Sequence, residues 1–349
     1  MALAPYPWLE EAARDLNAIR DELPNAILFY GARGAGAFDL ARAFAKSLLC
    51  EHPAPDGTPC GECAGCHLVA AGTHPDLKVV VSEYLAGVYD IPYTKPENSS
   101  SSKPSREIRI HQFRALIPFF NMAAHQGGRR VVVVYPADMI RSEAAASLLK
   151  SIEEPPQGMV FLLVADDIDE VLPTIRSRSR LFRIGLPSRA EALDWLGTKK
   201  RVKEPASALA LAGGSPLTAV EDVTGLEADE KTRKALIALL EKGASLSPDE
   251  LVRAHVAPLS KMGSPALAHF MVRWTYDLIA VRMGLAPRYF VDEAELFSRL
   301  VEGTSLPALM GFFEEVQDMK RSAEHPLAAK SVFESVLFRY SAALMKPRR

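Results

Sequence analysis

The stretch Gly31-Ala32-Arg33-Gly34-Ala35-Gly36-Ala37-Phe38 decides the fold of this chain. The apolar run Ala26–Tyr30 before it predicts a strand, and Asp39–Leu49 after it has the apolar spacing of a helix. A strand, a glycine-rich turn and a helix in this order are typical of a loop that holds phosphate groups. Gly31 and Gly36 have the separation that such a loop requires. The sequence therefore predicts the frame of a nucleotide site.

The residues that would do chemistry in this loop are missing. A working loop continues with a Lys, which reaches the β- and γ-phosphates, and a Ser or Thr, which holds Mg²⁺. Ala37 and Phe38 stand at these two positions. We therefore expect no functional ATP binding by the degenerate loop, which consists of Gly31, Gly34, Gly36, Ala37 and Phe38.

Further apolar runs alternate with helical patterns in the first half of the chain and predict an α/β fold with a five-stranded parallel sheet. They are Leu77–Val81, Arg130–Tyr135, Met159–Val164 and Arg180–Ile184. Such continuous apolar runs are typical of strands that are covered on both faces.

The third of these five strands ends without the residues of an active ATPase. An active site would place Asp-Glu there, to hold Mg²⁺ and to orient the attacking water. Tyr135 and Pro136 occupy those positions. Asp138 follows two residues later, and we expect it to be a helix cap or a turn residue.

Length and composition are those of an ordinary globular protein, with 349 residues, 48% hydrophobic and 24% charged. This length predicts two or three domains. No apolar run approaches the roughly 20 residues of a membrane span, and the first residues lack the pattern of a signal peptide. We therefore expect a cytoplasmic protein. A net charge of −2 gives no global argument for nucleic-acid binding.

All four cysteines lie in one short segment, at Cys50, Cys60, Cys63 and Cys66. In a chain without an export signal, such clustering favours metal binding over disulfides. Four thiolates predict a closed, structural Zn²⁺ site, with reduced thiols or an iron–sulfur cluster as the alternatives. Residues 51–69 contain no Lys or Arg, which argues against a stand-alone zinc-dependent DNA-binding protein because phosphate contacts need cations.

The remaining segments divide into a polar loop and a helical second half. The proline-flanked run at residues 92–107 predicts a mobile surface loop. Ser188 and Glu191 predict a capping box that opens a small helical domain reaching to about Leu226. Beyond it, apolar stripes predict a helical bundle, over Pro265–Met283, Leu309–Met319 and Ala328–Met345.

Three arginines alternate with serines after a short turn that begins at Pro173, namely Arg176, Arg178 and Arg180. The simplest interpretation is a solvated basic edge. The functional interpretation is an arginine finger, a guanidinium that one subunit inserts into the ATP site of its neighbour. Arginine suits this role because its charge is permanent and its donors match phosphate oxygens.

Taken together, these features resemble the clamp-loader subunits of bacterial DNA polymerase III, which are AAA+ proteins. The degenerate loop and the cysteines occur in the family's order, followed by Ala144–Pro156 and Leu172–Ser179. The family's helix signature is close to Ala-Asn-Ala-Leu-Leu-Lys-Thr-Leu-Glu-Glu-Pro-Pro, and its finger motif is Ser-Arg-Cys. By this resemblance Arg178 is the finger and Ser177 its preceding serine, whereas Ser179 departs from the family's cysteine. Leu217 stands where the family's sensor-2 arginine would fall.

The resemblance also implies an architecture and a set of partners. It implies an AAA+ core at residues 1–186 with a zinc module at about 50–66, a helical lid at 187–226 and an all-α collar at 227–349. The partners would be delta and ATP-hydrolysing gamma or tau subunits in a hetero-pentamer that loads the sliding clamp on primed DNA. This chain would be a non-hydrolysing stator of the polymerase holoenzyme, with an active gamma- or tau-type ATPase as the alternative.

Overall fold

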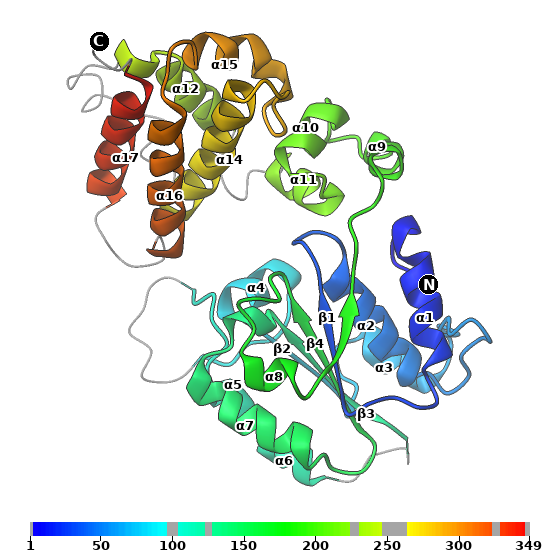
Figure 1. The fold of residues 1–349 in the computed structure, drawn as a ribbon. Coiled ribbons are helices and arrows are strands. Elements are labelled where there is room, and N and C mark those ends of the chain that lie inside the picture. Colours follow the sequence, from blue (N-terminus) through cyan, green and yellow to red (C-terminus); the bar gives the residue numbers. More distant parts are fainter. Residues whose placement is uncertain are drawn as a thin grey trace. The chain divides into compact units, whose positions relative to one another are not determined.

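The computed structural model describes residues 3–95, 104–122, 128–223, 230–245, 264–322 and 329–345. The chain divides into two compact units, residues 1–187 and 188–349 (Figure 1). Residues 96–103 of the surface loop expected at 92–107 lie outside the described residues. None of the described helices has both the length and the apolar character needed to traverse a membrane.

The first unit contains the expected five-stranded parallel sheet, with strand order β2-β3-β4-β1-β5. The strands are β1 (Ala26–Tyr30), β2 (Leu77–Val81), β3 (Arg130–Tyr135), β4 (Met159–Ala165) and β5 (Arg180–Arg183). Each bound lies within one residue of the sequence expectation. The α/β fold class is therefore confirmed.

Helices cover both faces of this sheet (Figure 1). Alternate strand residues point to opposite faces, so Ile27 and Phe29 join one buried cluster while Leu28 joins the other. The first cluster packs against α1 (Glu10–Ala18) and α2 (Ala37–Leu48), and the second against α5 (Ile110–Arg114), α6 (Ile117–Asn121) and α7 (Ser142–Glu153). Shorter elements connect the layers, namely η1 (Pro7–Leu9), α3 (Ala64–Ala70), α4 (Glu83–Tyr89), η2 (Ala137–Met139) and α8 (Pro173–Arg176).

The expectation that all five strands are covered on both faces is wrong for two of them. β3 and β4 are buried along their whole length, and β1 is buried except at its last residue. β2 and β5 form the two edges of the sheet, and each carries exposed residues, including Leu181 on β5. An edge strand has a neighbour on one side only, so its apolar residues receive less cover.

Helices are the only regular secondary structure among the described residues of the second unit. Ser188 and Glu191 form the expected capping box at the start of α9 (Arg189–Gly197). Then follow α10 (Pro205–Leu211), α11 (Pro216–Val223), α12 (Glu230–Leu240), η3 (Gly243–Ser245), α14 (Ser264–Arg282), η5 (Val291–Glu293), α15 (Ala294–Leu300), α16 (Leu306–Ser322) and α17 (Ala329–Leu344).

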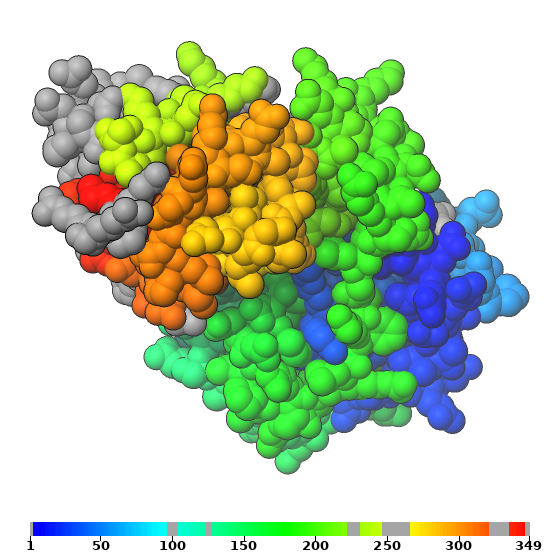
Figure 2. Space-filling view, turned by 45° about the horizontal axis from the view of Figure 1, so that its top comes forward, coloured from blue at the N-terminus to red at the C-terminus, as the bar shows by residue number. Residues whose placement is uncertain are grey.

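The core of the second unit forms around the aromatic stripe of α14. Phe270, Trp274 and Leu278 recur every four residues and are buried together in one cluster. Trp274 donates from its indole nitrogen to the hydroxyl of Tyr340 on α17 at 3.2 Å. On the outside, the yellow and orange residues of α14 and α15 form one continuous surface (Figure 2). The further division of this unit into a lid and a collar stays a prediction.

Candidate functional site

The four cysteines are brought together at the carboxyl end of α2. All four sulfur atoms lie within 4.8 Å of one another, and the Sγ of Cys50 is 3.6 Å from that of Cys60 and 3.9 Å from that of Cys63. A tetrahedral zinc site with Zn–S bonds of about 2.3 Å places its sulfurs about 3.8 Å apart. The cluster therefore has the geometry to hold one metal ion through four protein ligands.

Backbone N–H groups point at these sulfurs, which is what thiolate ligands require. The Sγ of Cys60 accepts from the N–H of Glu62 at 3.5 Å and of Cys63 at 3.3 Å. These donors lower the pKa of the Cys60 thiol to about 6, whereas burial raises the pKa of the Cys66 thiol to about 12. The Cys60 side of the cluster thus favours the deprotonated form that binds a metal.

The cysteine module, residues 50–66, is fastened to the first unit at several points. Ser47 of α2 donates its hydroxyl to the carbonyl of Gly57, and Asn17 of α1 donates to the carbonyl of Pro55 at 2.8 Å. A Cβ atom at Gly65 would stand 2.5 Å from the carbonyl oxygen of Leu49. The module therefore lies so close to the end of α2 that only a glycine fits at this position.

The phosphate loop keeps its backbone geometry. Gly34 and Gly36 have φ angles of 75° and 95°, the left-handed region in which other residues are strained. A Cβ atom at Gly31 would stand 2.2 Å from the carbonyl oxygen of Ile184. These positions need glycine for the turn and for close packing, independently of any ligand.

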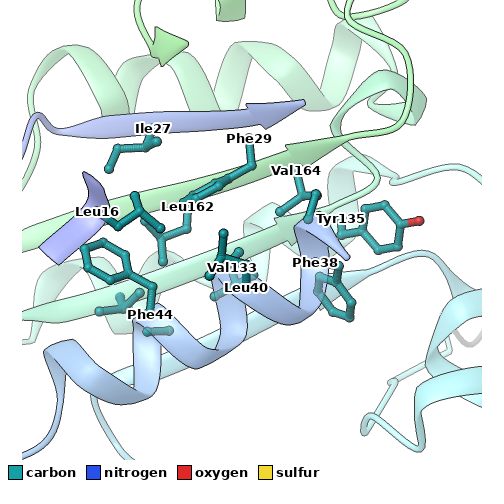
Figure 3. Close-up of a cluster of buried hydrophobic side chains, with 14 of the residues drawn as sticks. Leu16, Ile27, Phe29, Phe38, Leu40, Phe44, Val133, Tyr135, Leu162 and Val164 are labelled. Atoms are coloured by element: carbon teal, nitrogen blue, oxygen red, sulfur yellow. The ribbon is translucent and has the colours of Figure 1, made fainter. Parts of the chain in front are cut away.

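Aromatic side chains fill the space beside this loop. Phe38 is 4% exposed, and its ring stacks on Tyr135 with centroids 4.7 Å apart and contacts Tyr89 at 4.9 Å. Figure 3 shows the rings of Phe38 and Tyr135 side by side at one end of the buried cluster, with the Tyr135 hydroxyl pointing away from it. Two of the positions at which the chain departs from an active ATPase, Phe38 and Tyr135, thus pack against each other.

The loop is also covered from the amino-terminal side. Trp8 donates its indole N–H to the carbonyl of Ala35 at 2.9 Å, and its ring stacks on Tyr6 with centroids 4.9 Å apart. Tyr6 in turn donates its hydroxyl to Asp39 at 2.9 Å. Burial raises the pKa of Asp39, although the Tyr6 hydroxyl opposes this shift. The carbonyl of Ala35 and the carboxylate of Asp39 are therefore satisfied by the protein itself.

The sequence interpretation missed a polar network beyond Tyr135. The Tyr135 hydroxyl donates to the carboxylate of Asp166 at 3.0 Å, and the N–H of Asp166 donates to Asp138 at 3.2 Å. Burial raises the pKa of Asp138 to about 6 and raises that of Tyr135 well above its ordinary value. Asp166 directly follows the buried strand β4, and polar residues at that edge of a parallel sheet are the signal that could have identified it.

Arg178 lies between α8 and β5, and three groups hold its guanidinium. Its Nε donates to the carboxylate of Glu153, the last residue of α7. Its Nη1 donates to the carbonyl of Thr174 at 3.2 Å and to the hydroxyl of Ser177 at 3.3 Å. The side chain remains 40% exposed, so it is both held and accessible.

The structure does not bring Arg178 to the phosphate loop of its own chain. β1 and β5 run parallel, with Ile27 opposite Arg180 and Tyr30 opposite Arg183. Arg178 precedes β5, whereas the loop follows β1, so they lie at opposite ends of these two adjacent parallel strands. The four strand residues between them span about 13 Å at roughly 3.3 Å per residue.

The other expected site residue, Leu217, lies in the second unit. It is the second residue of α11 and is half-buried. Its side chain is apolar, so it offers no cation to a phosphate.

Comparison with known proteins identifies relatives of this chain. DNA polymerase III subunit delta' of Pseudomonas aeruginosa is 41% identical over 218 residues, which cover 61% of this chain and 60% of that protein. The subunit of the same name from Escherichia coli is 29% identical over 317 residues, covering 88% and 86%. The match to the Pseudomonas aeruginosa protein thus spans about three fifths of that relative's length.

A solved structure of a Thermotoga maritima protein related to the DNA polymerase III gamma subunit covers 95% of this chain and 99% of its own. Its identity is 17% and its TM-score 0.44. The family described as DNA polymerase III, delta subunit, matches residues 10–187, more than half of the 349 residues. The chain therefore belongs to the DNA polymerase III delta subunit family.

Proposed function

We propose that this chain is a delta-prime-type subunit of a clamp loader that hydrolyses no ATP and donates Arg178 to the ATP site of a neighbouring subunit. The placement of Arg178 is the observation that carries this proposal. Its side chain is exposed and is held by three groups. It lies at the end of the strands opposite to its own phosphate loop. A guanidinium in that position suits a phosphate that another subunit supplies.

The degenerate phosphate loop supports the proposal that this chain hydrolyses no ATP. Ala37 and Phe38 supply neither the phosphate-binding cation nor the Mg²⁺ ligand of an active loop. The stacked rings of Phe38 and Tyr135 occupy adjoining space. An active gamma- or tau-type ATPase would need these groups replaced at several positions at once.

The proposal extends to the metal and to the partners. The ion held by Cys50, Cys60, Cys63 and Cys66 would be Zn²⁺, because four thiolates in tetrahedral spacing suit it, and its role would be structural. The partners would be gamma or tau ATPase subunits and a delta subunit, which with this chain form a hetero-pentamer. That assembly would load the sliding clamp on primer-template DNA in the cytoplasm.

Substitution of Arg178 tests the proposed function most directly. In the reconstituted loader, Arg178→Ala should lower clamp- and DNA-stimulated ATP hydrolysis by about 10-fold or more, since fingers supplied by another subunit contribute about 10³–10⁵ in other systems. The side chain is exposed, so the variant should still fold and assemble. Steady-state hydrolysis measures the effect, and gel filtration checks assembly.

Arg180→Ala is the matched control for this test. Arg180 belongs to the same alternating run, and its side chain makes no hydrogen bond or ion pair with the described residues. We expect its loss to change the rate of ATP hydrolysis by less than 2-fold, because removal of an exposed side chain usually disturbs the fold little. Unchanged hydrolysis in Arg178→Ala would refute the finger assignment.

A stand-alone DNA-binding protein is the other class of function to test. The described part of the cysteine module offers no cation for phosphates, because residues 51–69 lack Lys and Arg. Fluorescence anisotropy of the isolated chain with primed duplex should therefore show weak binding. Tight binding by the isolated chain would favour that class over a stator.

A further inference from the structure

We infer that Glu153 is a positioning residue for Arg178, and this inference rests on the proposed function. Glu153 is the last residue of α7, and its carboxylate accepts the Nε–H of Arg178 across two separate elements. A positioning residue here would hold the guanidinium ready for the phosphate of a neighbouring subunit.

The position of Glu153 on α7 is unfavourable for the helix itself. The carboxyl end of a helix carries a partial negative charge, so a carboxylate there is repelled. Lys150, one turn earlier, has the sign that this end prefers. Helix stability therefore gives no reason for a glutamate at this position, and the contact with Arg178 does.

α7 is a rigid support for such a contact. Its inner face carries Ala144, Ala145, Leu148 and Ile152, all buried in the cluster beneath the sheet. The helix ends at Glu153, and the prolines at 155 and 156 prevent it from continuing. A side chain at the last turn of this packed helix thus has a fixed origin.

The contacts of Arg178 leave one side of its guanidinium open. Nε is taken by Glu153, and Nη1 is taken by Thr174 and Ser177. Nη2 donates no hydrogen bond to the described residues, although the side chain is 40% exposed. Two N–H groups of a guanidinium whose orientation is already fixed can therefore meet an incoming phosphate oxygen.

The neighbouring arginines lack this arrangement. Arg176 donates to the carbonyl of Ile168 at 3.3 Å and pairs with Asp169 at 3.6 Å, both in the loop just before its own turn. Arg180 has no side-chain hydrogen bond or ion pair with the described residues. Only Arg178 among the three is held by a residue of a separate helix whose inner face is buried, which is the difference that an oriented finger requires.

The test compares Glu153→Ala with Glu154→Ala in the reconstituted loader. Glu154 is the adjacent exposed carboxylate at the same helix end, and it has no side-chain partner among the described residues. The energy of an exposed ion pair, if it serves to orient a catalytic side chain, corresponds to a change in rate of about 2- to 5-fold. We expect Glu153→Ala to lower kcat for ATP hydrolysis by that factor with an unchanged KM for ATP, and Glu154→Ala to leave both unchanged.

The same measurement in an Arg178→Ala background separates positioning from a general structural effect. A residue that acts through Arg178 should have no further effect once Arg178 is gone, which is the coupling that a double-mutant cycle measures. An equal loss in both backgrounds, or no loss in either, would overturn the inference. A rise in hydrolysis would also overturn it, because Glu153 would then restrain Arg178.

The result with Arg178 separates this inference from the proposed function. If Arg178→Ala leaves hydrolysis unchanged, the proposed function itself fails and the inference falls with it. If Arg178→Ala lowers hydrolysis but Glu153→Ala does not, the finger stands and only the role of Glu153 is wrong.

Discussion

The two ends of α2 carry contrasting sites. At its amino end, the phosphate loop keeps the glycine turn but has lost the residues that bind a ligand. At its carboxyl end, Cys50 begins a module whose four cysteines have the geometry to hold one metal ion. Aromatic rings pack beside the amino end, whereas the carboxyl end brings together four sulfur atoms with the geometry to hold one metal ion.

The difference shows which parts of a site serve the fold. Gly31 and Gly36 are needed where the chain passes close to Ile184 and to the rings of Tyr6, whether or not a phosphate binds. The cysteine module has few buried apolar residues among positions 51–63, so it lacks a core of its own. A loop that belongs to the core keeps its shape without a ligand, whereas we expect a module without a core to depend on a bound metal.

Removal of one metal ligand should give the largest effect. Cys60→Ser takes away an exposed ligand without leaving a cavity, so it affects the metal more than the packing. We expect metal affinity to fall by more than the 10- to 100-fold that is typical of losing a residue behind the ligands. Metal content after dialysis measures the loss. Hydrogen exchange at Glu62, Cys63 and Cys66, whose N–H groups donate to sulfur, should become fast.

Thr58→Ala is the control within the same module. Thr58 donates to the carboxylate of Asp56 at 3.0 Å and contacts no sulfur. This variant should keep its metal and its protection from exchange. Full metal content in Cys60→Ser would contradict a site that needs all four thiolates.

Loss of the Phe38 ring at the amino end of α2 should give the second-largest effect. Phe38→Ala removes a side chain that is packed between Tyr135 and Tyr89, and such truncations cost about 3–5 kcal/mol. Urea denaturation with hydrogen exchange at β3 as the probe measures the free energy of unfolding of this unit. A loss of less than about 1 kcal/mol in the free energy of unfolding would contradict the close packing of Phe38 beside the loop.

Leu181→Ala provides the control within the same unit, since this leucine is 47% exposed on β5. A surface truncation of this kind should change stability by about 0.5 kcal/mol or less. Titration of the unaltered chain with labelled ATP adds a second check on the filled loop. Binding in the micromolar range would contradict our interpretation of the phosphate loop.

Much of this comparison was visible in the sequence because it depends on local pattern. The turn glycines, the apolar strands and the spacing of the cysteines each carry their own signal over a few residues. The same holds for the capping box of Ser188 and Glu191, which the structure confirms.

The contacts that complete each site were not predictable in this way. Trp8 reaches Ala35 across 27 residues, and Glu153 reaches Arg178 across 25. Such pairs follow from the order of strands in the sheet, which the pattern of one segment does not contain. The exposure of β2 and β5 was missed for the same reason, because only the strand order makes them edges.

The pH dependence of stability should have opposite signs for Asp138, near the phosphate loop, and Asp56, in the cysteine module. Burial raises the pKa of Asp138 to about 6, from 3.8, so between these values the folded state binds a proton that the unfolded state has lost. Its contribution therefore decreases as the pH rises from about 4 to 6. Asp138→Asn, which keeps an acceptor for the N–H of Asp166, should be more stable than the unaltered chain at pH 7 by roughly 1–3 kcal/mol. The two should converge near pH 4.

Asp56 in the cysteine module should behave in the opposite direction. The N–H and hydroxyl of Thr58 lower the pKa of Asp56, so its contribution is present above 3.8 and is lost as the pH falls. Asp56→Asn should therefore be slightly less stable than the unaltered chain at pH 7, with the difference vanishing in acid. Urea midpoints from pH 3 to pH 7 measure both variants. A gain in stability at pH 7 from both substitutions would contradict the contrast, because the charge at the metal end would then be as poorly accommodated as the charge beside the filled loop.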